Sequence, residues 1–180
     1  MNNKVLKRIL LGCSLLLLAL GLYFVLRFAF GGSMLIDLKG VDMYNTQILV
    51  NGMPEGLYGY SEVTQSMKLA DTFGNKKITV HSAGYKNFEA KQSIILRGYK
   101  IVIVKLVKAD ANDEGKKFLS TSRPIIPGKF VRAEYKLDPV TKVRYLTIII
   151  SNNNAERELL TQFNAVKGEW ENQLNGEVDD

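Results

Sequence analysis

The hydrophobic and polar positions of the chain form three successive patterns, and the first is an unbroken apolar run. Residues 9–30 are 22 positions with a single charge, Arg27. An α-helix needs roughly 20 apolar residues to cross the ~30 Å hydrocarbon layer of a bilayer. The run therefore predicts a transmembrane helix, and Gly31-Gly32-Ser33 after it predicts a flexible exit from that helix.

The second pattern, over residues 33–108, is the short alternation of apolar and polar residues that is typical of half-buried β-strands. Asn51-Gly52 predicts a tight turn, because both residues adopt positive φ at low cost. Arg97-Gly98 predicts a last hairpin, whose final strand is long and apolar enough to be central in a sheet. The predicted strands are residues 34–37, 46–50, 76–81, 93–96 and 99–106.

The third pattern follows residues 109–128, which lack apolar periodicity and are predicted to form a linker. Alternation at 130–137 and 142–150 predicts a hairpin around Asp138-Pro139-Val140-Thr141. Asn153 and Glu156 then have the spacing of a capping box at a helix start. The apolar face predicted for that helix consists of Leu159, Phe163, Val166, Trp170 and Leu174.

These patterns predict a mainly β protein with some α-structure, in four segments. Residues 1–32 are the N-terminus and transmembrane helix, and residues 33–108 are a β-unit. Residues 109–128 are a linker, and residues 129–180 are an α+β unit made of a β-hairpin, an amphipathic helix and an acidic tail.

Three pieces of the β-unit carry a resemblance to a known family. They are the strand that runs into Asn51-Gly52, the segment 74–80 that runs into Ala83-Gly84-Tyr85, and the strands on either side of Gly98. In these pieces the segment resembles the PEGA domain, a small β-sandwich of bacterial and archaeal surface proteins related to carboxypeptidase-regulatory-like and transthyretin-like modules. The family's usual Thr-Pro step is replaced by Gly59-Tyr60-Ser61, and the tetrapeptide that names it is missing. The resemblance implies that residues 33–108 form a PEGA-like β-sandwich, a non-catalytic envelope module that binds wall polymers or other proteins.

The charges of the chain bear on its topology and on its partners. There are 24 Lys and Arg residues against 18 Asp and Glu residues, but the first 32 residues hold four of the cations and no anion. The remainder is nearly balanced, which argues against a nucleic-acid partner. Lys4, Lys7 and Arg8 precede the apolar run, so the positive-inside rule predicts a cytoplasmic N-terminus. The chain is thus expected in the cell membrane as a single-pass protein with an extracytoplasmic C-terminal part.

Two forms of processing are alternatives to an uncleaved anchor. Leu10-Leu11-Gly12-Cys13 resembles a lipobox, which would make Cys13 a lipidated N-terminus. Ala19-Leu20-Gly21 has the small residues that a signal peptidase prefers. An uncleaved anchor is favoured, because too few apolar residues precede Cys13 and because cleavage would leave an exposed apolar start.

The residues that usually carry chemistry are sparse. Cys13 is the only cysteine and His81 the only histidine, so cysteine-rich zinc sites and Cys/His nucleophile pairs are excluded. His81 is interpreted as a surface residue of a strand. Residues 110–115 (Asp-Ala-Asn-Asp-Glu-Gly) resemble the start of a calcium loop, but Thr121 stands where the bidentate Glu is expected, so a solvated linker is favoured. No catalytic residue, metal ligand or cofactor is predicted.

Two candidate binding surfaces remain. Met53, Leu57, Tyr58 and Tyr60 form a candidate ligand loop for sugar rings or a protein, since aromatic side chains with polar tips suit both. The apolar face of the predicted C-terminal helix is a candidate partner face. The hypothesis is a membrane-anchored binding or scaffolding protein whose partner is a wall polymer or an envelope protein. The alternative is an accessory subunit of a larger membrane complex, docked through the anchor helix and the C-terminal helix.

Overall fold

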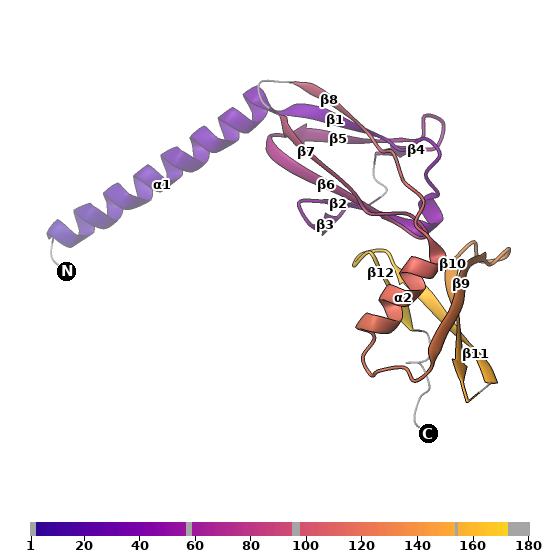
Figure 1. Cartoon of the computed structure of the whole chain (residues 1–180). Coiled ribbons are helices and arrows are strands. Elements are labelled where there is room, and N and C mark those ends of the chain that lie inside the picture. Colours follow the sequence, from indigo (N-terminus) through magenta and orange to yellow (C-terminus); the bar gives the residue numbers. More distant parts are fainter. Residues whose placement is uncertain (1–2, 57–58, 95–97, 154, 173–180) are drawn as a thin grey trace.

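The computed structural model describes residues 3–56, 59–94, 98–153 and 155–172. It consists of a long N-terminal helix, two packed β-sheets, and a second helix that lies on a third sheet (Figure 1). We call residues 32–109 the two-sheet unit and residues 110–172 the helix–sheet unit. The expectation of a mainly β protein with an N-terminal apolar helix is confirmed.

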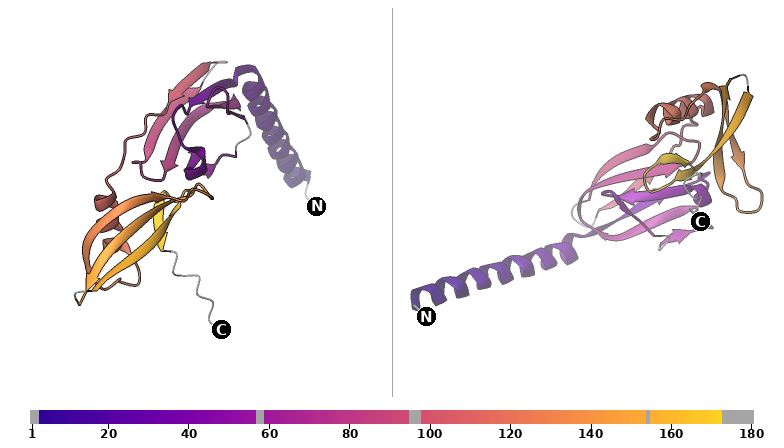
Figure 2. Two further views of the ribbon diagram at one scale, coloured as in Figure 1. Left: turned by 90° about the vertical axis from the view of Figure 1, so that its right-hand side faces the viewer. Right: turned by 90° about the horizontal axis from the view of Figure 1, so that it is seen from below.

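Helix α1 (Asn3–Phe30) contains the segment Lys7–Leu26, which is long and apolar enough to cross a membrane. This segment is exposed throughout, and Figure 2 shows α1 extending away from the rest of the chain in both views. Only Gly31 separates α1 from strand β1 (Gly32–Asp37). The prediction of a flexible exit is therefore wrong, because Gly32 and Ser33 already belong to a sheet. The Ser33 amide donates to the Gly98 carbonyl oxygen (3.1 Å).

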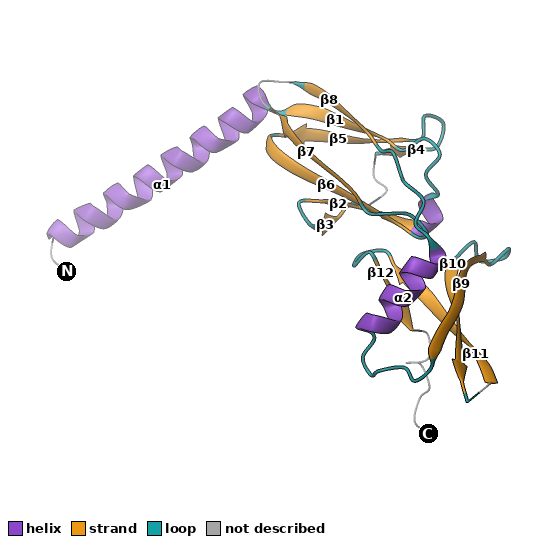
Figure 3. Cartoon of the chain, in the orientation of Figure 1, coloured by secondary structure: helices purple, strands orange, loops and turns teal. Residues whose placement is uncertain are grey.

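The two-sheet unit consists of two four-stranded sheets, shown in orange in Figure 3. One sheet has the order β4-β5-β1-β8, with β4 (Tyr60–Ser61), β5 (Ser66–Thr72) and β8 (Tyr99–Ile103). The other has the order β3-β2-β6-β7, with β2 (Thr46–Val50), β3 (Met53–Pro54), β6 (Gly74–Ser82) and β7 (Phe88–Ile94). A short 3-10 helix, η1 (Met43–Asn45), leads into β2.

Apolar side chains of one sheet pack against apolar side chains of the other sheet. Met34 and Ile36 of β1 face Ile78 and Val80 of β6, and all four are fully buried. The rest of this first core consists of Leu38, Ile48, Met67, Ile94, Val102 and Val104. In β1 and β7 more buried residues alternate with more exposed ones, whereas β2 and β6 end in runs of consecutive buried residues.

The turn after β2 confirms one prediction, and β8 corrects two others. Asn51 and Gly52 have φ values of 53° and 81° and join β2 to β3 as a hairpin. In contrast, β7 and β8 belong to different sheets, so they do not form the predicted hairpin. Strand β8 is also an edge strand, paired in parallel with β1, and not the central strand expected. Its apolar residues lie on both faces, and Ile101 and Ile103 remain exposed.

The helix–sheet unit contains α2 (Ala111–Thr121) and an antiparallel sheet in the order β12-β11-β10-β9. The strands are β9 (Lys129–Leu137), β10 (Arg144–Asn152), β11 (Ala155–Asn164) and β12 (Glu169–Asn172). The predicted hairpin of residues 130–137 and 142–150 is confirmed as β9 and β10. Helix α2 packs over this sheet, and the second core consists of Ala83, Phe118, Ala133, Leu146, Ile148, Ile150, Leu159 and Trp170.

Two predictions for this unit are wrong. Residues 111–121, expected in a linker, form α2, because Asp110 caps the helix by accepting the amides of Asn112 (2.8 Å) and Asp113 (3.2 Å). Residues 155–172, expected as a helix, form β11 and β12, and β11 pairs with β10 along its length. Leu159 and Thr161 are buried at a spacing of two. Asn153 has φ of 48° and so occupies a turn, not a helix cap.

Candidate functional site

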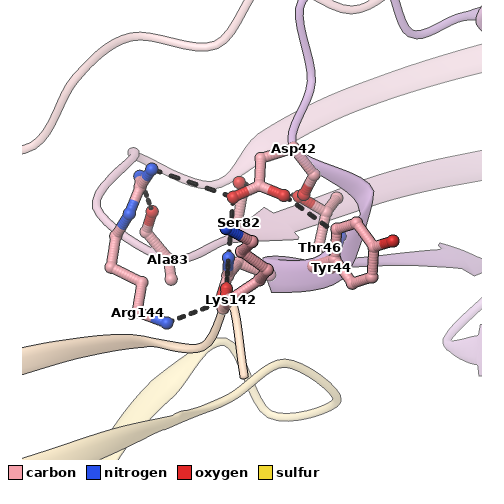
Figure 4. Close-up of polar contacts among 8 residues, drawn as sticks. Asp42, Tyr44, Thr46, Ser82, Ala83, Lys142 and Arg144 are labelled. Atoms are coloured by element: carbon pink, nitrogen blue, oxygen red, sulfur yellow. Dashed lines mark hydrogen bonds and ion pairs between the residues drawn. The ribbon is translucent and has the colours of Figure 1, made fainter. Parts of the chain in front are cut away.

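The polar junction between the two units is organised by Asp42 and Asn45, which lie just before β2 (Figure 4). Asp42 caps η1 by accepting the amide of Tyr44 (3.1 Å) and the side-chain amide of Asn45 (2.6 Å). Asn45 then donates to the Lys142 carbonyl (2.8 Å) and accepts the Arg144 amide (2.7 Å). A single buried side-chain amide therefore ties the two-sheet unit to the backbone at the start of β10.

The guanidinium of Arg144 makes the second set of contacts at this junction. It donates to the Ala83 carbonyl oxygen (2.8 Å), and its other terminal nitrogen lies 3.8 Å from a carboxylate oxygen of Asp42. It also lies over the Tyr85 ring, 5.7 Å from the centroid. Ala83 itself belongs to the second core although it follows β6 in the chain. The junction is consequently a packed contact and not a loose hinge.

His81 forms a third contact across the junction, and the expectation that it lies on the surface is wrong. It is 8% exposed, and its Nδ1 lies 3.1 Å from the Ala165 carbonyl oxygen in the turn between β11 and β12. A Cβ at Gly168 of the same turn would lie 2.8 Å from the imidazole ring. The ring is therefore held between the units by close packing, which is a structural role.

A cleft on the helix–sheet unit lies between α2 and β12. It has a volume of about 590 Å³. Phe118, Ile126 and Trp170 supply its apolar surface. The indole of Trp170 is fixed by two aromatic neighbours, stacking on Tyr135 at 5.8 Å and meeting Phe163 edge-on at 5.1 Å between centroids. Because Trp170 is 8% and Phe118 9% exposed, these rings form a rigid floor of which little reaches solvent.

The rims of this cleft carry charges of both signs. Glu114 and Lys117 come from α2, Arg123 follows it, and Glu169 and Glu171 come from β12. A hydrogen bond from Lys167 (2.7 Å) lowers the pKa of Glu171, and the Asn164 side-chain amide (3.0 Å) acts in the same direction. Both hydrogen bonds favour the carboxylate form of Glu171.

A smaller cleft of about 320 Å³ lies at the junction of the two units. It is lined from one side by Gly84, Tyr85 and Lys108 and from the other by Tyr135 and Arg144. Burial raises the pKa of Tyr135 to about 12, with smaller contributions from the charges of Glu114 and Asp110. Its hydroxyl has no hydrogen-bond partner among the described residues. Tyr135 therefore acts here as a neutral aromatic side chain.

The structure does not assemble the predicted ligand loop from its described members. Met53 is exposed on β3, whereas Tyr60 is half-buried on β4 and packs against the first core. These two strands belong to different sheets. Leu57 and Tyr58 lie outside the described residues. The described members thus form no shared aromatic surface.

The predicted partner face is also dispersed, because its residues lie on strands. Leu159 and Trp170 are buried in the second core and Phe163 packs against it, while Val166 is exposed in the turn between β11 and β12. Leu174 lies outside the described residues. The cations predicted to determine the topology, Lys4, Lys7 and Arg8, all lie in α1, and Lys7 and Arg8 are exposed. The face proposed for docking an accessory subunit is consequently absent as a helix face.

Of the residues that line the cleft, sequence reasoning singled out Trp170, as a member of the predicted partner face, and missed those of α2. The available signal was the spacing of Ala111, Gly115 and Phe118, which repeats at four and three residues after an Asp cap. Gly115 obscured it, although this glycine is required where it is. A Cβ at Gly115 would lie 2.8 Å from the Ala133 Cβ and 3.1 Å from the Phe130 ring. The glycine therefore permits α2 to approach the sheet closely.

The described residues contain no group of three or more His, Cys, Asp or Glu side chains that could hold a metal ion. Asp110, the first residue of the calcium-like segment, is the cap of α2. No protein-family model matches the chain, and no curated protein or solved structure matches it. The site is therefore interpreted from its own geometry.

Proposed function

We propose that this chain is a single-pass, membrane-anchored envelope protein whose extracytoplasmic part binds or scaffolds a partner without catalysing a reaction. The observation that carries the proposal is the segment Lys7–Leu26, an exposed apolar helix that continues into β1 after one residue, Gly31. An exposed helix of this length and composition is stable in a bilayer and unfavourable in water. The proposed orientation, with the N-terminus in the cytoplasm, rests on Lys4, Lys7 and Arg8.

The proposal includes a PEGA-like β-sandwich for the two-sheet unit. It is supported by two four-stranded sheets that pack around one aliphatic core, and by the hairpin at Asn51-Gly52. In this role the sandwich is a spacer and scaffold. The contacts of Asn45, Arg144 and His81 make the helix–sheet unit a fixed extension of it.

We assign the binding role to the cleft between α2 and β12. Its charged rims can hold a wall polymer or a segment of an envelope protein by charge-assisted hydrogen bonds. The alternative role of an accessory subunit retains the anchor helix but no longer has a C-terminal helix to dock with.

The topology is tested with single-cysteine chains expressed in cells. In a Cys13→Ala background, Val140→Cys places a thiol in the exposed turn between β9 and β10. A membrane-impermeant maleimide is expected to label Val140→Cys in intact cells and to label a matched Asn3→Cys chain only after lysis. Labelling in the opposite pattern would refute the proposed orientation. For the wild-type chain, an intact mass that begins near Leu22 or that carries lipid at Cys13 would refute the uncleaved anchor.

The binding role is tested with the full chain in detergent, mixed with insoluble wall polymer and, separately, with solubilised envelope proteins. Retention is expected, and charge reversal at the cleft by Lys117→Glu with Arg123→Glu should weaken it. The matched control is Lys86→Glu with Lys91→Glu, two exposed lysines of the two-sheet unit. If neither material binds the wild-type chain, the binding role is wrong. If the control pair alone abolishes retention, the cleft is not the site.

A further inference from the structure

The point at which the chain leaves α1 is tied to two other strands of the first sheet. Thr72, the last residue of β5, donates its hydroxyl to the Gly32 carbonyl oxygen (3.2 Å). Gly98, just before β8, accepts the Ser33 amide (3.1 Å), and a Cβ at Gly32 would collide with that same carbonyl. The end of β5 and the start of β8 therefore lie beside the end of α1, whatever the tilt of the helix.

Two exposed aromatic side chains occupy this end of the two-sheet unit. Phe73 follows Thr72 and is 39% exposed, although a phenyl ring gains by burial. Tyr99 follows Gly98, pairs with Ser33 and is 55% exposed. Lys100, next to Tyr99, is also exposed. An aromatic pair with a neighbouring cation is the composition that favours the headgroup region of a bilayer.

The length of α1 places Phe73 and Tyr99 near the headgroup region. The segment Lys7–Leu26 has 20 residues, which at about 1.5 Å per residue cover the ~30 Å hydrocarbon layer. The four helical residues after Leu26 add about 6 Å, which is within the headgroup layer, since that layer extends roughly 5–8 Å on each side. Gly32 then follows after one residue, so Phe73 and Tyr99 begin at the outer edge of the headgroups.

From these contacts we propose that Phe73, Tyr99 and Lys100 form a second membrane contact, in which the α1-proximal end of the two-sheet unit rests in the headgroup layer of the bilayer that holds α1. From the outer edge of the headgroups the two rings reach inward toward the glycerol groups, and Lys100 pairs with lipid phosphate. This contact restrains the tilt of the two-sheet unit and so sets the height of the cleft above the membrane. It rests on the proposed anchoring of α1.

The test uses the full chain in vesicles of phosphatidylcholine and phosphatidylglycerol that contain lipid brominated near the headgroup end of the acyl chain. Phe73→Trp and Tyr99→Trp are compared with Val63→Trp, which is 96% exposed near the opposite end of β5. The native Trp170 is buried and is subtracted as background. Bromine is expected to quench the new tryptophans at positions 73 and 99 at least about twofold more than the one at position 63.

The experiment tests the membrane anchor and the second membrane contact separately. Flotation of the vesicles after carbonate washing reports the anchor by itself. If the chain floats and positions 73 and 99 are quenched no more than position 63, the second contact is wrong while the anchor stands. If the chain does not float, the proposed membrane anchoring is wrong and this contact falls with it. Quenching at both positions, reduced by Lys100→Glu but not by Lys105→Glu, supports the complete contact.

Discussion

The two-sheet unit and the helix–sheet unit bury their cores in different ways. In the two-sheet unit, two sheets cover each other, and the ten core residues are aliphatic or methionine. In the helix–sheet unit, one sheet is covered on one face by α2, and its core contains Phe118 and Trp170 with Tyr135 and Phe163 packed against them. The first core is thus distributed over many strands, whereas the second depends on one 11-residue helix.

In the helix–sheet unit, one face of the sheet β12-β11-β10-β9 is not covered by α2. Its residues are nevertheless shielded from water. Thr147 is fully buried and Ile149 nearly so, although both point away from the side that α2 covers. On this face Lys136 bridges Glu158 (2.9 Å) and Glu134 (3.4 Å), and the aliphatic parts of these side chains lie over β10. Long charged side chains therefore cover this face of the helix–sheet unit, whereas in the two-sheet unit each sheet is covered by the other.

The largest expected effect comes from truncating one residue in each core. Ile36→Ala and Ile148→Ala both remove buried methyl groups from fully buried positions, so each should cost about 3 kcal/mol of unfolding free energy. Trp170 fluorescence reports the helix–sheet unit by itself, and amide hydrogen exchange reports β1 and β6. We expect Ile148→Ala to shift the fluorescence midpoint in denaturant and Ile36→Ala chiefly to lower protection in β1. Equal shifts in both probes for both variants would mean that the units unfold as one.

The next largest effect on unfolding is expected at the junction between the two units. Arg144→Met keeps the aliphatic stem but removes the donor to Ala83 and the charge beside Asp42, so we expect a loss of about 2 kcal/mol. The change should increase the difference between the unfolding midpoints of the two units more than it lowers the stability of either unit. The midpoints reported by Trp170 fluorescence and by amide hydrogen exchange should therefore diverge. Arg132→Met, a change at an exposed residue of β9, should leave the two midpoints together. An unchanged separation would show that Asn45 and His81 suffice to couple the units.

A change at the cap of α2 tests how far the stability of the helix–sheet unit depends on this helix. Asp110→Ala removes the acceptor for the amides of Asn112 and Asp113, which should cost about 1 kcal/mol. The loss should appear in Trp170 fluorescence and not in the exchange of β1. Asp113→Ala is the matched control, since it removes an acidic residue of the first turn without removing the cap. If the control is as destabilising as the cap variant, charge and not capping stabilises this helix start.

The contrast between the units also explains what the sequence could predict. Strands β2 and β6 were predictable because β2 contains a short apolar run next to a turn signal and apolar and polar residues alternate from Lys77 to His81 in β6. Asn51-Gly52 was predictable because its turn needs positive φ at both residues. Strand β8 was placed wrongly because Ile101 and Ile103 are apolar yet exposed, which makes an edge strand resemble a central one.

In the helix–sheet unit, tertiary contacts override the local patterns. Leu160 beside Leu159 obscures the two-residue period of β11, and Asn153 resembles a helix cap although it occupies a turn. Gly115 weakens the helical signal of α2 because Ala133 and Phe130 leave no space for a side chain. The cleft combines residues 114–126 with residues 168–172, and no local pattern joins segments so far apart.

The smallest expected effect is at Tyr135, and its sign distinguishes packing from hydrogen bonding in the aromatic core. The hydroxyl is buried without a partner among the described residues, so Tyr135→Phe should leave the unfolding free energy at pH 7 unchanged or raise it by up to about 1 kcal/mol. Tyr145→Phe, on the neighbouring strand, is the matched control. A loss above about 1 kcal/mol in Tyr135→Phe would show that the hydroxyl makes a stabilising contact.

Alkaline pH provides the second measurement at this residue. The folded pKa of Tyr135, about 12, lies above the value of about 10 for an unfolded tyrosine. As pH rises from about 10 towards 12, the unfolded chain therefore releases this proton before the folded chain does, and stability falls. Tyr135→Phe removes that contribution, so its unfolding free energy should decline less than that of the wild type across this interval. Equal declines, measured by denaturant titration followed through Trp170, would mean that the hydroxyl ionises as readily in the folded chain as in the unfolded one, and that burial at this position does not exclude charge.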